Sequence, residues 1–286
     1  MAGDAAREIE KRVRVAGTSF YWAMRSLSAE KRRAIFAVYA FCREVDDIAD
    51  SEEDGAKKST QLNEWRGRIA DLFKSNPTDV ITKELLIANA MYGLEKEPYL
   101  AIIEGMEMDA TGPIQAPSRA EFDLYISRVA SAVGLLCIRI FGEAGEEGKT
   151  TAEHLGRALQ ITNILRDLRE DADWDRLYLP RDLLQKFGIF STNPKEVLKN
   201  ENLDALCREL AEVASEEFRL ADQAFKKCDP KKVKPALIMR DAYQRTLKRL
   251  IRRGWSPEAV EKPRSGVEKV LSKLAKIFIA LKYSVR

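Results

Sequence analysis

At 286 residues with 45% hydrophobic content, the chain is long enough to bury a core, which excludes a disordered or fibrous protein. Its 48 basic residues outnumber its 45 acidic ones by only three, so net charge gives no argument for a nucleic-acid partner. Four widely separated cysteines without a Cys-x-x-Cys, and a single histidine, disfavour both a disulfide framework and a zinc site.

The N-terminal segment, residues 1–15, predicts a short charged helix over 4–15 and lacks the apolar core of a signal peptide. The longest uninterrupted apolar runs lie near 34–42 and 277–281, far short of the roughly 20 residues that cross a bilayer. We therefore expect a soluble protein in a reducing cytoplasm, folded as one domain over 1–286.

A long helix is expected to begin after Ser28, a favoured N-cap, with Glu30 in the first turn where a negative charge suits the helix dipole. One stripe along this helix starts apolar and ends in two carboxylates: Ile35, Val38, Tyr39, Cys42, Asp46 and Asp50. Arg43 lies one turn before Asp46, within reach of a phosphate that a metal ion would hold there.

The middle of the chain reads as a polar loop over 51–58 and helical patterns at 59–74, 79–94 and 98–108. Ser118 and Glu121 form a capping box that opens the next helix, on which Tyr125, Val129 and Val133 share a face. Residues 130–134 of that helix are mostly small. They indicate either tight helix packing or room for a long apolar ligand, with Tyr125 as a lone hydroxyl on its wall.

A second polar stripe lies on the helix that leads to residue 171. Gln160, Asn163, Asp167 and Asp171 follow at steps of three, four and four, so they share one face of a helix that is apolar on its other sides. Carboxylates one turn apart repel each other, and oxygen ligands with room for phosphate suit magnesium. Chance spacing on a solvated surface is the alternative, and the similar acids at 46–50 weigh against it.

Beyond Pro180 the pattern predicts helices at about 181–187, 194–199, 202–227 and 236–253, the last basic on its outer face. Residues 264–286 mix lysines with apolar residues, which indicates a core helix with a solvated face or a surface that rests on lipid headgroups. No stretch alternates like a strand and no repeat is evident. The fold class expected is all-α.

The chain resembles the squalene/phytoene synthase family of head-to-head prenyl transferases in several stretches, which follow the family order from near 17 to about 180. These are Ser19–Arg25, Tyr39–Asp50, Gly105–Asp109, Arg128–Gly134 and Leu155–Asp171 with Tyr178-Leu-Pro180. Within the family, the sequence is most similar to the bacterial presqualene diphosphate synthases of hopanoid pathways. Phytoene synthases usually carry a bulky residue at Ser127 and often read Val-Ala-Gly-Thr-Val-Gly where this chain reads Val-Ala-Ser-Ala-Val-Gly.

The resemblance implies an isoprenoid-synthase helical fold with a central cavity, in which Mg²⁺ joins two acidic motifs to diphosphate. Its metal-ligand positions fall on Asp46, Asp50, Asn163, Asp167 and Asp171. Tyr125 matches a tyrosine that takes part in the chemistry as acid, base or cation stabiliser. The implied substrate-binding positions are Ser19, Phe20, Tyr21, Tyr39, Arg43, Val133, Gly156, Gln160, Asn163, Arg166, Arg176 and Tyr243.

The implied reaction joins two farnesyl diphosphates into presqualene diphosphate, and NADPH is not expected unless the protein is a full squalene synthase. Phytoene and dehydrosqualene synthases are alternatives in the family. A terpene cyclase, a chain-elongating prenyl transferase and a non-catalytic helical scaffold are more distant ones. Delivery of substrate from lipid favours peripheral contact with the inner face of the cytoplasmic membrane. The pattern leaves the prenyl chain length and the oligomeric state open.

Overall fold

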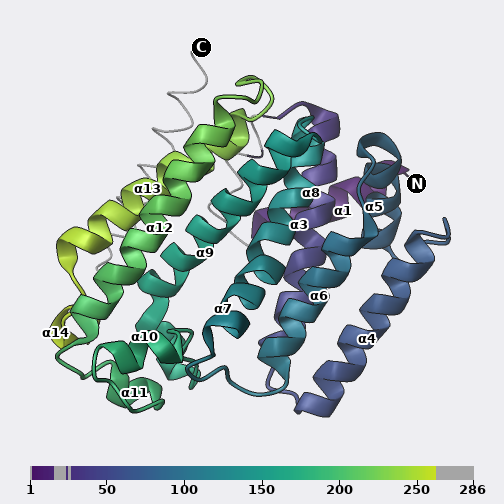
Figure 1. Cartoon of the computed structure of the whole chain (residues 1–286). Helices are drawn as coiled ribbons and strands as arrows, with labels where there is room; N and C mark the ends of the chain where they lie inside the picture. The colour runs from purple at the N-terminus through teal and green to yellow at the C-terminus, as the bar shows by residue number, and fades with distance from the viewer. Residues whose placement is uncertain (1, 16–23, 25–26, 262–286) are drawn as a thin grey trace.

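The computed structural model of the chain describes residues 2–15, 24 and 27–261, and all regular elements in these ranges are helices (Figure 1). The predicted all-α fold is confirmed. In chain order the helices are α1 (Ala2–Val15), α3 (Ala29–Ala49), α4 (Gly55–Leu72), α5 (Val80–Tyr92), α6 (Lys96–Ala110), α7 (Arg119–Ile126), η1 (Ser127–Ser131), α8 (Ala132–Phe141), α9 (Glu146–Asp173), α10 (Arg181–Lys186), α11 (Pro194–Val197), α12 (Leu203–Phe225), α13 (Lys234–Arg253) and α14 (Pro257–Glu261).

Helix α9 is the central helix of the bundle. It packs against α12 and α13 on one side and against α7, η1 and α8 on the other (Figure 1). Its 28 residues span about 42 Å at 1.5 Å per residue. Leu155, Ile161, Leu165 and Leu168 are all buried, as the apolar positions around the helix predicted. The polar stripe of α9 therefore runs through the interior of the molecule.

Helix α3 packs on α1, α5, α6 and α8 and ends at the same end of the molecule as α9 (Figure 1). The Ser28 hydroxyl accepts a hydrogen bond from the Lys31 backbone N–H, so the predicted N-cap is confirmed. Asp50 is the C-cap residue of α3. Helix α4 begins at Gly55 because Asp54 caps it, so the loop expected over 51–58 is shorter than its composition indicated.

The helix that follows the Ser118–Glu121 capping box contains a π-helical segment, η1, between α7 and α8. The sequence predicted a continuous α-helix there. η1 is wedged between two glycines: a Cβ at Gly105 on α6 would lie 2.7 Å from Val129 Cγ1, and a Cβ at Gly156 on α9 would lie 2.8 Å from Ser131 Cα. Small residues thus allow close helix packing, and the inserted residue of a π segment is typical of functional sites.

One helix, residues 119–141, is long and apolar enough to cross a membrane by length and composition. Its segments pack against α6 and α9 inside the bundle, which is how the core helix of a globular protein passes the same test. The helix predicted at 264–286 and the predicted loop Ser19–Tyr21 lie outside the described residues.

Candidate active site

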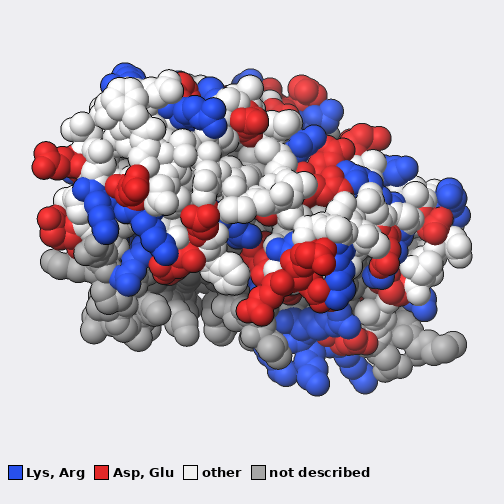
Figure 2. Space-filling model, turned by 90° about the horizontal axis from the view of Figure 1, so that it is seen from below, with Lys and Arg blue, Asp and Glu red and all other residues white. Residues whose placement is uncertain are grey.

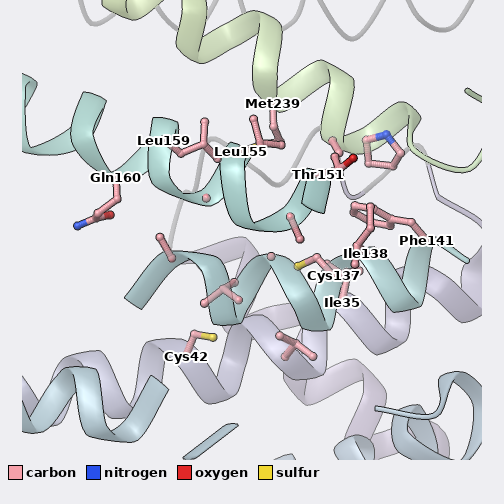
Figure 3. Close-up of a pocket in the computed structure, with 18 of the residues that line it drawn as sticks. Ile35, Cys42, Cys137, Ile138, Phe141, Thr151, Leu155, Leu159, Gln160 and Met239 are labelled. Carbon is pink, nitrogen blue, oxygen red and sulfur yellow. The ribbon is translucent and has the colours of Figure 1, made fainter. Parts of the chain in front are cut away.

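An apolar cavity of about 350 Å³ lies between α3, the η1–α8 segment, α9 and α13 (Figure 3). Six of the substrate-binding positions implied by the resemblance line it: Tyr39, Val133, Gly156, Gln160, Asn163 and Tyr243. Along α9 the lining runs from Thr151 to Asn163, a rise of about 18 Å at 1.5 Å per residue. The cavity is therefore long and narrow enough for an extended hydrocarbon chain.

The two ends of the cavity differ in chemistry. Gln160 lies at one end of the view in Figure 3, whereas Phe141 and Ile138 lie at the other. The thiols of Cys42 and Cys137 line the middle, and burial raises the pKa of both, so they stay uncharged at neutral pH. The end at Phe141 and Ile138 is mainly apolar, and Gln160 at the other end is nearer to Asp167 along α9.

The first acidic motif occupies the last turn of α3. The side chains of Asp46 and Asp50 are 43% and 44% exposed. A carboxylate at a helix C-terminus faces the negative end of the helix dipole, and this helix has no basic residue in its last turn. The helix dipole therefore does not stabilise this motif, and its negative charge must be balanced by cationic groups outside the last turn of α3.

The second acidic motif occupies the corresponding end of α9, whose last turn also has no basic residue. The Asp167 side chain is only 19% exposed, as the apolar residues on the other sides of this helix indicated. Figure 2, which views the molecule from this end, shows acidic and basic side chains intermingled across the middle of the surface. Two helix C-termini therefore bring like charges together at one end of the bundle.

Burial and mutual repulsion act directly on these acids. Burial, followed by the charge of Asp50, raises the pKa of Asp46 to about 6. Burial, followed by the charge of Asp167, raises the pKa of Asp171 to about 7. Asp109 adds repulsion to both, which places the two motifs and this third acid within electrostatic range of one another.

Three arginines neutralise the motifs. Arg43 forms an ion pair with Asp46 at 3.1 Å and a second one with Asp47. Arg166 makes a two-pronged contact with Asp167, at 2.9 Å and 2.5 Å. Arg176, from the segment after α9, forms an ion pair with Asp50 at 2.8 Å and so joins the chain just beyond the second motif to the first motif.

A buried group of tyrosines lies next to the motifs. The Asp109 carboxylate accepts hydrogen bonds from the Tyr125 hydroxyl at 3.0 Å and from the Tyr178 hydroxyl at 2.7 Å. The two rings stack at 5.0 Å between centroids. Tyr125 is thus not the lone hydroxyl that the sequence indicated, and it is not among the lining residues of the cavity, although Val129 one turn later is. Burial raises the pKa of Tyr125 well above its usual value, so it is a neutral donor.

One buried oxygen near the acidic motifs is a suitable ligand for a divalent cation. The Asn163 side-chain oxygen is buried and has no hydrogen-bond partner among the described residues. A buried unpaired carbonyl oxygen is costly, and hard cations take such oxygens as ligands. No group of three or more acids, cysteines or histidines in the described ranges is close enough to hold a metal ion without rearrangement. The acids are instead turned toward arginines.

Residues 13–265 match the sequence model of the squalene/phytoene synthase family. The chain therefore belongs to this family. It is 44% identical over 269 residues to a presqualene diphosphate synthase from Rhodopseudomonas palustris, covering 94% of each chain. It is 42% identical to one from Sinorhizobium fredii, covering 90% of this chain and 91% of the relative. A phytoene synthase from Mycobacterium tuberculosis is 38% identical over 65% of this chain and 60% of its own length.

Solved structures of the family share the fold. A dehydrosqualene synthase aligns over 99% of this chain and 98% of its own with a TM-score of 0.81 at 24% identity. A squalene synthase from Alicyclobacillus acidocaldarius aligns over 90% and 96% with a TM-score of 0.82 at 21% identity. The isoprenoid-synthase helical fold expected from the resemblance is confirmed.

Sequence reasoning missed two members of this site. Asp109 and Tyr178 fall inside stretches that resemble the family, yet neither was singled out, because their partners are 16 and 69 residues away in the chain. No spacing rule connects them. The available signal was that an acid on the buried face of a helix, beside Ile102, Gly105 and Met106, needs a buried donor.

Proposed function

We propose that the protein condenses two farnesyl diphosphates head to head into presqualene diphosphate, as a magnesium-dependent prenyltransferase that supplies squalene and hopanoid synthesis. The observation that carries the proposal is the cavity itself, an apolar pocket lined by α3 and α9, the two helices whose C-terminal ends carry the acidic motifs. The names of the relatives at 42% and 44% identity point to the same reaction.

Asp46, Asp50, Asn163, Asp167 and Asp171 are the residues proposed to hold Mg²⁺, with Asp109 as a nearby buried charge. When bound, the ion would neutralise the charge that gathers on the departing diphosphate. Arg43, Arg166 and Arg176 would bind the diphosphate oxygens in the same region, as guanidinium groups suited to two-pronged contacts.

In the proposed reaction the C1–O bond of one farnesyl diphosphate breaks, and diphosphate leaves with the electron pair. The allylic cation adds to the double bond of the second farnesyl diphosphate, and loss of one proton closes a cyclopropane. The products are presqualene diphosphate, diphosphate and a proton. The carbon-lined cavity keeps water from the cation, which would otherwise be captured as an alcohol.

We propose that Tyr125 acts as a neutral dipole beside the cation and that it is oriented by Asp109. Its proton is directed at the Asp109 carboxylate, which leaves the electron-rich side of the hydroxyl oxygen for positive charge. Burial raises the pKa of Asp109, so this carboxylate is a better proton acceptor than an exposed aspartate. Tyr178 fixes the other carboxylate oxygen.

A cytoplasmic location with peripheral contact at the inner face of the cytoplasmic membrane is proposed as well. The apolar helix 119–141 packs inside the bundle and so does not serve as an anchor. A prenyl diphosphate with a 15-carbon tail partitions into lipid, which favours an enzyme that meets its substrate at the membrane surface. A high-salt wash of membranes should release the protein into the soluble fraction.

The test of the proposed function is incubation of the purified protein with farnesyl diphosphate and Mg²⁺, with and without NADPH, followed by mass spectrometry of the products. A 30-carbon cyclopropyl diphosphate that persists with NADPH supports the proposal. Squalene formed only with NADPH, dehydrosqualene formed without it, or phytoene formed from the 20-carbon substrate would each move the protein to another branch of the family. Absence of both product and Mg²⁺–diphosphate binding would restore the scaffold alternative.

A further inference from the structure

Arg176 stands in a segment whose backbone is fixed on both sides. Its own N–H donates to the Asp171 carbonyl at 2.9 Å, which ties it to the last turn of α9. The next residue, Leu177, donates to the Ile114 carbonyl at 2.7 Å and accepts from the Ala116 N–H at 2.9 Å. Asp175 before it has a left-handed φ of +60°. The backbone position from which the Arg176 side chain extends is therefore fixed.

The Arg176 side chain then spans the gap between the two motifs. It is 15% exposed and contacts Asp50 on α3 at 2.8 Å. The guanidinium also lies 6.0 Å from the centroid of the Trp174 ring, and its charge acts on Asp109 and Asp171. The positive charge of Arg176 thus attracts carboxylates on α3, α6 and α9. A cation that bridges the two motifs would attract the same carboxylates.

We propose that Arg176 is a positioning residue that holds Asp50 near the end of α9 before the divalent cation binds, and that it then passes from Asp50 to the diphosphate. The inference rests on the proposed function, because it takes a metal-bound diphosphate as the ligand. Arg176 contacts Asp50 through the carboxylate oxygen Oδ1, and we infer that the metal ion takes this carboxylate through both oxygens. Metal binding therefore displaces the guanidinium, and the diphosphate that accompanies the metal supplies it with a new anionic partner.

The arrangement makes a thermodynamic prediction. Mg²⁺ alone must break the Arg176–Asp50 ion pair without giving Arg176 a new partner, so it binds weakly to the native protein. Pyrophosphate supplies that partner, so Mg²⁺ and pyrophosphate should strengthen each other's binding, by equal factors. Mg²⁺ and pyrophosphate also attract each other directly, so the contribution of Arg176 is the part of the coupling that is lost when Arg176 is replaced, and a purely structural ion pair would contribute no such part.

The experiment is isothermal titration calorimetry of the full chain with Mg²⁺ alone and with Mg²⁺ plus inorganic pyrophosphate. Arg176→Gln should bind Mg²⁺ alone about fivefold or more tighter than the native protein and should lose about tenfold of the coupling with pyrophosphate, within the usual range for linked sites. Arg176→Lys keeps the charge and should keep Mg²⁺ binding weak. Arg181→Gln, the same change at an exposed position five residues later, should alter neither value.

Unchanged or weaker Mg²⁺ binding by a folded Arg176→Gln protein would overturn the proposal. Should that variant fail to fold, the native protein labelled with ¹⁵N-arginine provides the second measurement, with the Arg176 Nε–H signal assigned from Arg176→Lys. The signal should shift when Mg²⁺ and pyrophosphate are added together, and an unmoved signal overturns the proposal. Neither measurement depends on a prenyl product, so failure of the farnesyl assay and failure of this inference are distinguishable.

Discussion

The two ends of the cavity stabilise themselves in opposite ways. The far end needs no partner, because Phe141 and Ile138 are buried apolar side chains and the Cys137 thiol farther along the wall is uncharged. The acidic end is not complete. Burial and repulsion raise the pKa of Asp46 to about 6 and of Asp171 to about 7, and a buried Asn163 oxygen lacks a hydrogen bond in the described residues.

This difference indicates that the acidic end binds charged groups, whereas the apolar end accommodates a hydrocarbon chain by its shape. Packing residues lower the free energy of the fold, whereas clustered acids at helix C-termini raise it unless a cation is present. Substitutions at the acidic end should therefore affect turnover far more than stability. Substitutions along the apolar wall should affect chain selection or stability, with smaller effects on turnover.

The largest expected effect is the loss of turnover in Asp167→Asn. This change removes one negative charge from the proposed metal site while it keeps the size of the side chain, so diphosphate release should fall on the order of 10³-fold. Asp46→Asn should behave alike. The measurement is the rate of diphosphate release from farnesyl diphosphate at saturating Mg²⁺.

Asp173→Asn is the matched control, because Asp173 is an exposed acid in the same turn region of α9 and outside the motif. It should retain nearly native turnover. Normal activity in folded Asp46→Asn and Asp167→Asn proteins would remove the acid assignment, and equal loss in all three variants would indicate a general charge effect.

The next largest effect is expected at the apolar end. Phe141→Leu should enlarge the closed end of the cavity, so the ratio of the rate with the 20-carbon diphosphate to that with the 15-carbon one should rise about 10-fold. Competition between the two substrates, read by mass spectrometry, measures it. Phe190→Ala, an 81% exposed phenylalanine, is the control and should leave the ratio unchanged. An unchanged ratio in Phe141→Leu would place chain-length selection elsewhere.

The sequence predicted the acidic end better than the apolar end, for a physical reason. Asp46 and Asp50, or Asp167 and Asp171, lie one helical turn apart, so residue spacing alone puts each pair on one face. Helix α9 also showed its burial through apolar residues on several sides. The positions of Tyr39, Gln160 and Tyr243 on one cavity came only from the family resemblance, and their agreement with the cavity lining is a result of the structure.

Long-range partners were beyond such reasoning. The contact of Arg176 with Asp50 and that of Tyr178 with Asp109 depend on how α9 crosses α3 and α6, which spacing does not encode. The π segment η1 was also missed, because its residues Ser127–Ser131 have no sequence pattern that differs from an α-helix. Only the glycines that press on it, Gly105 and Gly156, hint at the close approach.

Gly156→Ala should disrupt this close packing and moderately lower the stability of the fold. The added Cβ would lie 2.8 Å from Ser131 Cα and 2.9 Å from Ser131 N, so the backbones of α9 and η1 must move apart. Overpacking of this kind costs about 1–3 kcal/mol, and the melting temperature should fall by several degrees. In Gly67→Ala the new Cβ meets nothing within 4 Å in the middle of α4, so that variant should be as stable as the native protein or more so. Equal melting temperatures for both variants would contradict the packing argument.

A further effect is expected in the pH dependence of the metal-free protein. The folded-state pKa values of about 6 for Asp46 and about 7 for Asp171 exceed the unfolded value of about 3.9, so between about pH 4 and pH 7 the folded state binds more protons. The free energy of unfolding should therefore fall as pH rises through this window, and the penalty is complete above it. Calorimetric melting in a chelating buffer should show a lower melting temperature at pH 8 than at pH 5.

The double variant Asp46→Asn, Asp171→Asn is the control for this pH dependence of stability, because an amide does not titrate in this range. Its melting temperature should change less between pH 5 and pH 8 than that of the native protein. Carboxyls with lowered pKa values, such as Glu121 and Asp204, lose their stabilising effect only below about pH 4.5, so they act outside the window. A native melting temperature that rises from pH 5 to pH 8 would mean that Arg43 and Arg176 neutralise the motifs fully, and that the acidic end is as complete without a cation as the apolar end.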